Sequence, residues 1–173
     1  MSHKGSKWIL PIVLSLSAFA ADFASKAWAN QNLQLGNSVI FVPGFMRFTL
    51  ARNTGGAWSI GRDNPLFMTI LASTIVLGLS FWLWKREQSD SPPGNLERSG
   101  IALIMGGAIG NLFDRFTRGE VTDFLDFAFM QFPIFNVADS LIDIGAGLIV
   151  ISALFLQPKT ETAKEDPKDS GVK

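Results

Sequence analysis

Four long runs of apolar residues divide the chain, and each is a candidate for a helix that crosses a membrane. They cover about residues 8–29, 66–84, 100–116 and 134–156. The second run is the clearest, because it contains no charged residue. The pattern predicts a mainly α-helical integral membrane protein. We expect four transmembrane helices in a single domain over residues 1–156, followed by a polar, disordered tail over residues 157–173.

The third run is the least typical of a membrane span. Its apolar part ends near Phe113, which is short of the ~20 residues that a crossing needs. It contains Gly106, Gly107 and Gly110, and such small residues let membrane helices approach one another closely. We therefore expect a helix that packs tightly against its neighbours.

The first run has a competing interpretation as a cleaved signal peptide. Two lysines precede it, and the small residues around Ala18 would suit a cleavage site. However, the apolar character continues to Trp28, and Asp22 and Lys26 lie four residues apart, on one face of a helix. This arrangement favours a retained helix with a polar stripe inside the bundle.

Two segments between the helices have their own patterns. Residues 45–52 alternate in polarity directly after a Pro-Gly pair, which predicts a β-hairpin within residues 36–60. Residues 124–129 are rich in phenylalanine, and we expect them to form a short amphipathic segment at the lipid interface. The hairpin would then form a small platform beside the membrane.

Lysine and arginine set the expected orientation. Nine of them lie in the two termini and the loop between the second and third runs, against five in the other two connections. Because cytoplasmic segments carry the excess of positive charge, both termini are expected in the cytoplasm. The β segment and the connection before the fourth run would then face outward.

Composition removes most catalytic chemistries. The chain has no Cys and no Tyr, and its only histidine, His3, lies in a polar N-terminal segment. Thiol nucleophiles, zinc–thiolate sites and Ser-His-Asp triads are therefore excluded or strongly disfavoured. A formal net charge of zero gives no basic field for nucleic acid, so no nucleic-acid partner is expected. Carboxylates remain as the main acid/base groups, and we expect neither a metal nor an organic cofactor.

Two carboxylates occupy positions that favour function. Asp139 lies about five residues into the fourth run, near its outer boundary, and Asp123 lies in the outward-facing connection before it. A charge inside an apolar span costs several kcal/mol unless it is compensated, and such residues are commonly functional. Two acids that meet near the surface could share one proton and activate water, as in aspartic proteases.

A structural role for the same acids stays open at this point. Asp143 lies one turn from Asp139 on the fourth run, so the two acids could simply pair with Lys26 or Arg115 of another helix. From this helix alone, structural ion pairing and catalysis weigh equally. Asp143 would lie deeper in the membrane, and we expect it either to support the site indirectly or to pair with a packing partner.

Five short motifs occur in a fixed order along residues 8–156. They are Asp22…Lys26, Asn53-Thr54-Gly55, the string from Gly106 to Arg115, Val121-Thr122-Asp123-Phe124, and Phe135-Asn136-Val137-Ala138-Asp139-Ser140. Together they resemble the motifs of the lipoprotein signal peptidases (signal peptidase II), a family of four-helix bacterial membrane aspartyl proteases. One departure is the sequence Gly55-Gly56-Ala57-Trp58, where the family usually has Gly-Ala-Ala-Phe.

The resemblance implies roles for individual residues. It makes Asp123 and Asp139 the catalytic dyad. The positions that would bind substrate or support the dyad are Asp22, Lys26, Asn53, Gly55, Gly107, Asn111, Arg115 and Asn136. Structural alternatives stay open for several of them, because buried asparagines also join membrane helices, and Asp22 with Lys26 could be an internal ion pair.

The resemblance also implies an activity. It implies an endopeptidase of the bacterial inner membrane that removes the signal peptide from diacylglyceryl-modified prolipoproteins, cutting just before the modified cysteine. Membrane lipid and globomycin-type cyclic peptide inhibitors are implied as further partners. The active site is expected near the extracytoplasmic face.

Two other functions compete with this interpretation. A small proton- or ion-coupled transporter could use Asp22, Lys26, Asp139 and Asp143 as a relay, although the second run offers only hydroxyl side chains at matching depth. A non-catalytic scaffold would leave the cost of the acids within the membrane unexplained.

Overall fold

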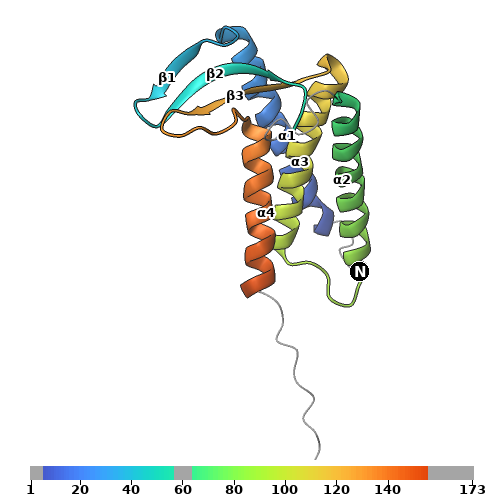
Figure 1. Cartoon of the computed structure of the whole chain (residues 1–173). Helices are drawn as coiled ribbons and strands as arrows, with labels where there is room; N and C mark the ends of the chain where they lie inside the picture. The colour runs from blue at the N-terminus through green and yellow to red at the C-terminus, as the bar shows by residue number, and fades with distance from the viewer. Residues whose placement is uncertain (1–5, 57–63, 156–173) are drawn as a thin grey trace, which may run out of the picture.

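The computed structural model describes residues 6–56 and 64–155, so the predicted tail lies outside the described residues. The elements in chain order are α1 (Ser6–Asn32), β1 (Ser38–Val42), β2 (Met46–Asn53), α2 (Pro65–Arg86), α3 (Asn95–Arg118), β3 (Val121–Phe127) and α4 (Val137–Phe155). The helices stand side by side, and the sheet projects from one end of the bundle (Figure 1). The start of α1 and the end of α4 lie at the opposite end (Figure 1). The mainly helical prediction with a small β platform is confirmed.

Three of the helices are long and apolar enough to cross a membrane: Lys7–Asn32, Leu66–Arg86 and Val137–Phe155. The composition of α3 does not meet the same criterion, although its 24 residues would extend about 36 Å. This helix packs against α1, α2 and α4, so much of its surface faces protein and not lipid. The surface of α3 therefore needs fewer apolar side chains than the surfaces of the other helices.

Glycines let α3 approach its neighbours closely. A Cβ atom at Gly106 would lie 2.5 Å from the backbone oxygen of Ser15 in α1. One at Gly107 would lie 2.6 Å from the backbone oxygen of Ala138 in α4. Both distances are far below van der Waals contact, so the predicted role of these glycines in close helix packing is confirmed.

The sheet has the antiparallel order β1-β2-β3, and Gly44 turns the chain between β1 and β2 at a φ of 72°. The expected alternation of β2 fails at Thr49 and Leu50, which are both buried. The pairing of β2 with β3 shifts register between Phe48 and Ala51. Such an irregularity places two successive residues on the inner side, which simple period-two alternation does not allow for.

Most of the predicted amphipathic segment at residues 124–129 belongs to β3. Phe124 is buried in a cluster with Ala29 of α1 and Leu50 of β2. The strand's partner lies about 75 residues earlier in the chain, in β2. Phe124 therefore belongs to a core that residues far apart in the chain form together, which the sequence of this segment alone did not predict.

The fourth helix begins at Val137, not at residue 134 as predicted. Phe135 is extended and exchanges backbone hydrogen bonds with Leu125 of β3, at 3.0 and 2.8 Å. Asp139 consequently lies in the first turn of α4, closer to the end of the helix than expected.

A polar clasp closes the end of the bundle away from the sheet. Glu87, directly after α2, accepts hydrogen bonds from Arg98 Nε at 2.5 Å and Arg98 Nη2 at 3.1 Å. The ammonium group of Lys7 lies 3.5 Å from Glu87 Oε2. The hydrogen bond from Arg98 lowers the pKa of Glu87, so this residue joins α1, α2 and α3 as a carboxylate.

Candidate active site

Asn136 joins the two acids that the sequence singles out. Its side-chain Nδ2 donates to Oδ1 of Asp123 at 2.7 Å, and its backbone N–H donates to Oδ2 of Asp139 at 3.2 Å. Asn136 itself is completely buried. The structure therefore brings Asp123, on β3, and Asp139, on α4, to the two sides of one asparagine.

The same asparagine explains where α4 begins. Asn136 Oδ1 accepts a hydrogen bond from the backbone N–H of Asp139 at 3.0 Å, while the Asp139 carboxylate accepts from the backbone of Asn136. This reciprocal pair is a capping box, with Asn136 as the N-cap and the acid three residues later. The carboxyl group of Asp139 is thus held at the helix N-terminus, which favours negative charge.

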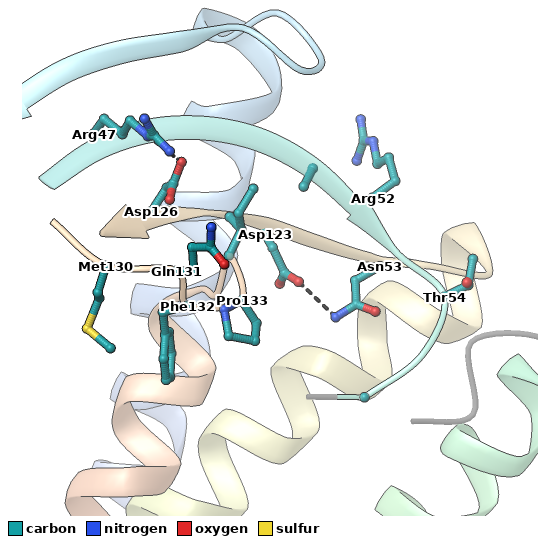
Figure 2. Close-up of a pocket in the computed structure, with 13 residues that line it drawn as sticks. Arg47, Arg52, Asn53, Thr54, Asp123, Asp126, Met130, Gln131, Phe132 and Pro133 are labelled. Carbon is teal, nitrogen blue, oxygen red and sulfur yellow. Dashed lines mark hydrogen bonds and ion pairs between the residues drawn. The ribbon is translucent and has the colours of Figure 1, made fainter. Parts of the chain in front are cut away.

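Each carboxyl group has a second asparagine partner. Asn53 Nδ2 donates to Oδ2 of Asp123 at 2.9 Å, as Figure 2 shows, and Asn111 Nδ2 donates to Oδ1 of Asp139 at 2.9 Å. The side-chain oxygen of Asn53 in turn accepts from the backbone N–H of Gly55 at 2.9 Å. The amides therefore fix the orientation of both acids.

The environment of Asp123 favours its protonated form. Burial is the largest cause, followed by the negative charge of Asp139, and together they raise the pKa of Asp123 to about 7. The hydrogen bonds from Asn53 and Asn136 and the charge of Lys26 act in the opposite direction. An acid with a pKa near neutrality can donate or accept a proton under physiological conditions.

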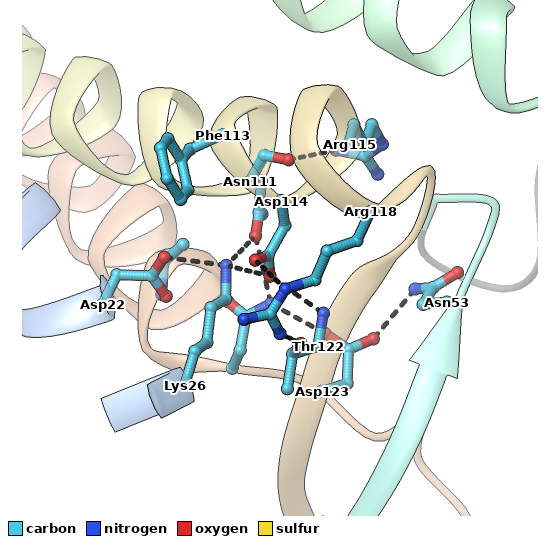
Figure 3. A network of polar contacts seen from close by, with 12 residues as sticks. Asp22, Lys26, Asn53, Asn111, Phe113, Asp114, Arg115, Arg118, Thr122 and Asp123 are labelled. Carbon is cyan, nitrogen blue, oxygen red and sulfur yellow. Dashed lines mark hydrogen bonds and ion pairs between the residues drawn. The ribbon is translucent and has the colours of Figure 1, made fainter. Parts of the chain in front are cut away.

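A buried ion-pair network lies behind the two acids, centred on Lys26 (Figure 3). The Nζ of Lys26 lies 2.7 Å from Oδ2 of Asp22 and 3.4 Å from Oδ2 of Asp114, and it donates to Oδ1 of Asn111 at 2.8 Å. The side chains of Lys26, Asp22 and Asp114 are each at most 5% exposed. The predicted pair of Asp22 and Lys26 is therefore part of a larger network.

This network holds the backbone next to each acid. Asp22 Oδ1 accepts from the N–H of Ala138, which precedes Asp139, at 2.9 Å. Asp114 Oδ2 accepts from the N–H of Thr122, which precedes Asp123, at 3.0 Å. Neither Asp22 nor Lys26 lines the cavities described below, so their positions suit support of the acids and not contact with a substrate.

Sequence reasoning missed the role of Asp114, which lies in the motif string from Gly106 to Arg115 but was given no function of its own. A signal was present, because Asn111, Asp114 and Arg115 are spaced at three and four residues and so share one face of a helix. The capping box formed by Asn136 and Asp139 was also visible in the sequence as an Asx residue followed three positions later by an acid.

Arg115, Gly55 and Gly107, which the resemblance also implies as site residues, have different surroundings. Arg115 Nη2 donates to the backbone oxygen of Gly55 at 2.9 Å, which holds the segment after β2 against α3. The Nε of Arg115 is buried and has no hydrogen-bond partner in the described part of the chain. Gly107 lines neither cavity and serves the close packing of α3 on α4.

Two cavities meet at Asp123. One, of about 640 Å³, runs along the sheet past Arg47 and Arg52 (Figure 2). The other, of about 410 Å³, is lined by both acids and Arg115 together with apolar side chains such as Phe135. Asp123 lines both cavities, so a chain that occupied the two would pass the pair of acids.

Asp143 differs from expectation. It is an exposed residue, and it forms no hydrogen bond or ion pair with any other residue in ranges 6–56 and 64–155. The alternative of a packing partner for Asp143 is therefore wrong. Instead, Asp143 lines the 410 Å³ cavity together with Asp139.

The arrangement defines a class of site. Two carboxyl groups share amide donors at the meeting point of two cavities, and one of them has a pKa near neutrality. This is the arrangement that suits acid/base activation of water by a pair of aspartates.

Comparison with known proteins agrees with that class. The family model described as Signal peptidase (SPase) II matches residues 14–155. A lipoprotein signal peptidase of Shewanella pealeana is 38% identical, covering 98% of this chain and 95% of that protein. One from Gloeobacter violaceus is 36% identical, covering 92% and 88%. A solved structure described as a bacterial membrane enzyme has a TM-score of 0.74 at 32% identity, covering 94% of each chain.

The chain therefore belongs to the signal peptidase II family, and it is a multi-pass membrane peptidase. The alternative of an ion-coupled transporter finds no support. Asp22 and Lys26 are buried and form ion pairs within one network, and the relatives are named as peptidases.

Proposed function

We propose that this protein removes the signal peptide from diacylglyceryl-modified prolipoproteins, cleaving just before the lipid-modified cysteine, with Asp123 and Asp139 as its catalytic dyad. The observation that carries the proposal is the link through Asn136, which holds both carboxyl groups at the junction of the two cavities. Membership of the signal peptidase II family supports the substrate class.

The two acids have distinct roles in this proposal. Asp139, at a helix N-terminus, is the carboxylate that takes a proton from water as the water oxygen attacks the scissile carbonyl carbon. Asp123, with its raised pKa, gives its proton to the carbonyl oxygen. When the tetrahedral intermediate collapses, Asp139 returns the proton to the leaving nitrogen and Asp123 recovers its own. The dyad ends each cycle as it began.

Arg115 would bind the substrate backbone. Its Nε is a buried donor without a partner in the described residues, and the side chain lines the cavity that contains both acids. A substrate carbonyl oxygen is the natural acceptor for such a donor. The amides of Asn53, Asn111 and Asn136 then keep the acids oriented, and Gly55, Asp22 and Lys26 hold the elements that carry them.

We further propose that α3 crosses the membrane with the other three helices, so that residues 1–156 form one four-helix domain. The start of α1 and the end of α4 lie at the same end of the bundle, as an even number of crossings requires (Figure 1). The excess of Lys and Arg in the termini and the loop after α2 supports a cytoplasmic location for that end. The dyad would then lie at the extracytoplasmic face of the bacterial inner membrane.

In this setting, membrane lipid contributes to catalysis. The acyl chains of the substrate would hold the scissile bond at the depth of the interface, where the first turn of α4 presents Asp139. Such anchoring lowers the entropy lost when bond and dyad meet.

The direct test is cleavage by the purified protein of a diacylglyceryl-modified precursor, with mass spectrometry of the new N-terminus. We expect cleavage before the modified cysteine, and inhibition by a globomycin-type cyclic peptide. Asp123→Asn should abolish the reaction, whereas Asp90→Asn, in the exposed loop after α2, should leave it unchanged. Full turnover by Asp123→Asn would refute the assignment of the dyad.

A further inference from the structure

The side-chain amide of Asn111, on α3, lies between Lys26 of α1 and Asp139 of α4. Its Oδ1 accepts hydrogen bonds from Lys26 Nζ at 2.8 Å (Figure 3) and from Asn136 Nδ2 at 3.1 Å. Its Nδ2 donates to Oδ1 of Asp139 at 2.9 Å. Asn111 is buried, so water has little access to these contacts. The ammonium group and the acid therefore contact opposite ends of one amide.

The direction of this amide is set by its partners. An ammonium group can only donate hydrogen bonds, so Asn111 must turn its oxygen toward Lys26. The NH2 group, which also only donates, then faces Asp139 and favours the ionised form of that acid. In the reversed orientation an amide oxygen would face Asp139, and it could form a hydrogen bond only with a protonated carboxyl group. The orientation of Asn111 therefore selects the form of Asp139.

The charged groups around this amide come from four elements. They are Asp22 and Lys26 on α1, Asp114 and Arg115 on α3, Asp123 on β3, and Asp139 and Asp143 on α4. Two of these acids, Asp22 and Asp114, pair directly with Lys26, which offsets much of its charge as felt at the dyad. The hydrogen bond through Asn111 is the specific route from Lys26 to Asp139.

We propose that Lys26 is a positioning residue that sets the direction of proton transfer in the dyad. By holding the oxygen of Asn111, it keeps the NH2 group on Asp139, so that Asp139 stays the base and the shared proton stays on Asp123. The inference rests on the proposed function, because it concerns which acid takes the proton from water. Lys26 acts without touching the substrate, in agreement with its absence from the lining of both cavities.

The pH profile of kcat/KM tests this inference. Its acid limb reports ionisation of the base, and its alkaline limb reports loss of the proton from the acid. The profile would be measured with a diacylglyceryl-modified precursor for wild type, Lys26→Met and Lys26→Arg. The matched control is Lys7→Met, because Lys7 is a second lysine of α1 that pairs with an acid, Glu87, away from the dyad. Melting temperatures in detergent would be measured alongside.

We expect the acid limb of Lys26→Met to move to higher pH by about one unit or more, the size of a hydrogen bond to a charged group. The methionine cannot donate, so the amide of Asn111 is free to reverse. The alkaline limb should move less. Lys26→Arg, which also only donates, should keep the wild-type acid limb. Lys7→Met should lose thermal stability but keep both limbs.

A direct electrostatic effect of Lys26 and a purely structural effect give different results. Loss of its charge alone would move both limbs together, because that charge also acts on Asp123. Loss of packing alone would lower the melting temperature and kcat without moving either limb. If the hydrogen bond from Asn136 were enough to hold the amide of Asn111, the acid limb would likewise stay in place.

The outcomes therefore separate the two proposals. An unmoved acid limb, or an equal movement of both limbs, in folded Lys26→Met would overturn the role of Lys26 and leave the peptidase intact. A folded Lys26→Arg whose acid limb moves as far would also contradict it. Failure of the wild type to cleave the precursor would count against the proposed function itself. If Lys26→Met does not fold, Lys26→Gln decides, because its amide accepts either orientation of Asn111 and an unmoved acid limb again contradicts the inference.

Discussion

At the scale of single residues, the two proposed catalytic acids differ in what surrounds them. Asp123 is almost completely buried in the sheet, and Asp139 is half-buried at the start of a helix. The negative charge of Asp139 is one of the causes that raise the pKa of Asp123 to about 7. The two acids are coupled through this charge, so the pair titrates as a unit, and the proposed mechanism puts the shared proton on Asp123.

This proton predicts the alkaline limb of the pH profile. Asp123 must be protonated to donate to the substrate carbonyl, so kcat/KM should fall as the pH rises through about 7. Initial rates across a pH series with a diacylglyceryl-modified precursor would measure the midpoint. A rate that stays constant up to about pH 9 would contradict the role of Asp123 as the acid.

The same shift predicts a pH-dependent stability. The folded pKa of about 7 lies above the ordinary value of 3.8, so the folded chain binds this proton more tightly than the unfolded chain. The contribution to stability is complete below about pH 4 and is lost as the pH rises through about 7. Wild type should therefore lose thermal stability relative to Asp123→Asn as the pH rises from about 4 to about 7. A difference in melting temperature that does not change with pH would contradict this prediction.

Asn53 offers a second test at this scale. Its amide hydrogen bond lowers the pKa of Asp123, so Asn53→Ala should move the alkaline limb to higher pH and lower kcat. Asn37→Ala, which removes an exposed asparagine before β1, is the control. A limb that moves to lower pH, or does not move, would show that Asn53 acts in some other way.

At the scale of elements, the sequence predicted which segments are helical, but it placed the start of α4 three residues too early. The four apolar runs correspond to α1–α4. The length of an apolar run can be read from the local sequence, and a single polar residue within the run does not change it. The start of α4 depends on the capping box of Asn136 and Asp139, and β3 depends on pairing with a strand about 75 residues away. Non-local pairing of that kind leaves little trace in the segment itself.

The packing of α3 on α4 predicts a sharp difference between two glycines. Gly107→Ala would place a methyl group 2.6 Å from the backbone oxygen of Ala138, whereas Gly78 in α2 has nothing within 4 Å. We expect Gly107→Ala to cost about 1–3 kcal/mol and to reduce cleavage, because Ala138 precedes Asp139. Gly78→Ala should be neutral or slightly stabilising.

Thermal unfolding in detergent, together with the cleavage assay, would measure both glycine variants. Equal melting temperatures for Gly107→Ala and Gly78→Ala would show that α3 and α4 can separate without loss, against the close contact seen here.

At the scale of the whole molecule, polar groups concentrate at the two ends of the helix bundle. Asp123, on β3, and Asp139, in the first turn of α4, lie at the sheet end, whereas the clasp of Lys7, Glu87 and Arg98 joins the start of α1, the end of α2 and the start of α3. Those helix ends lie away from the sheet (Figure 1). The distribution of Lys and Arg in the sequence predicted the orientation of the chain in a membrane, but not the clasp. Its three residues lie up to 91 positions apart, and only the folded bundle brings them together.

The separation of the ends predicts that stability and catalysis can be altered independently. Glu87→Gln removes the carboxylate that accepts from Arg98 and pairs with Lys7, and we expect a loss of about 1–3 kcal/mol at neutral pH. Because the pKa of Glu87 is lowered from 4.5, its contribution is present above that value and is lost as the pH falls below it. The difference between variant and wild type should therefore shrink in acid. The folded Glu87→Gln variant should keep the wild-type kcat/KM, because the dyad lies at the far end of the bundle. A large fall in kcat/KM without unfolding would contradict this prediction and would mean that the clasp is coupled to the site through α3.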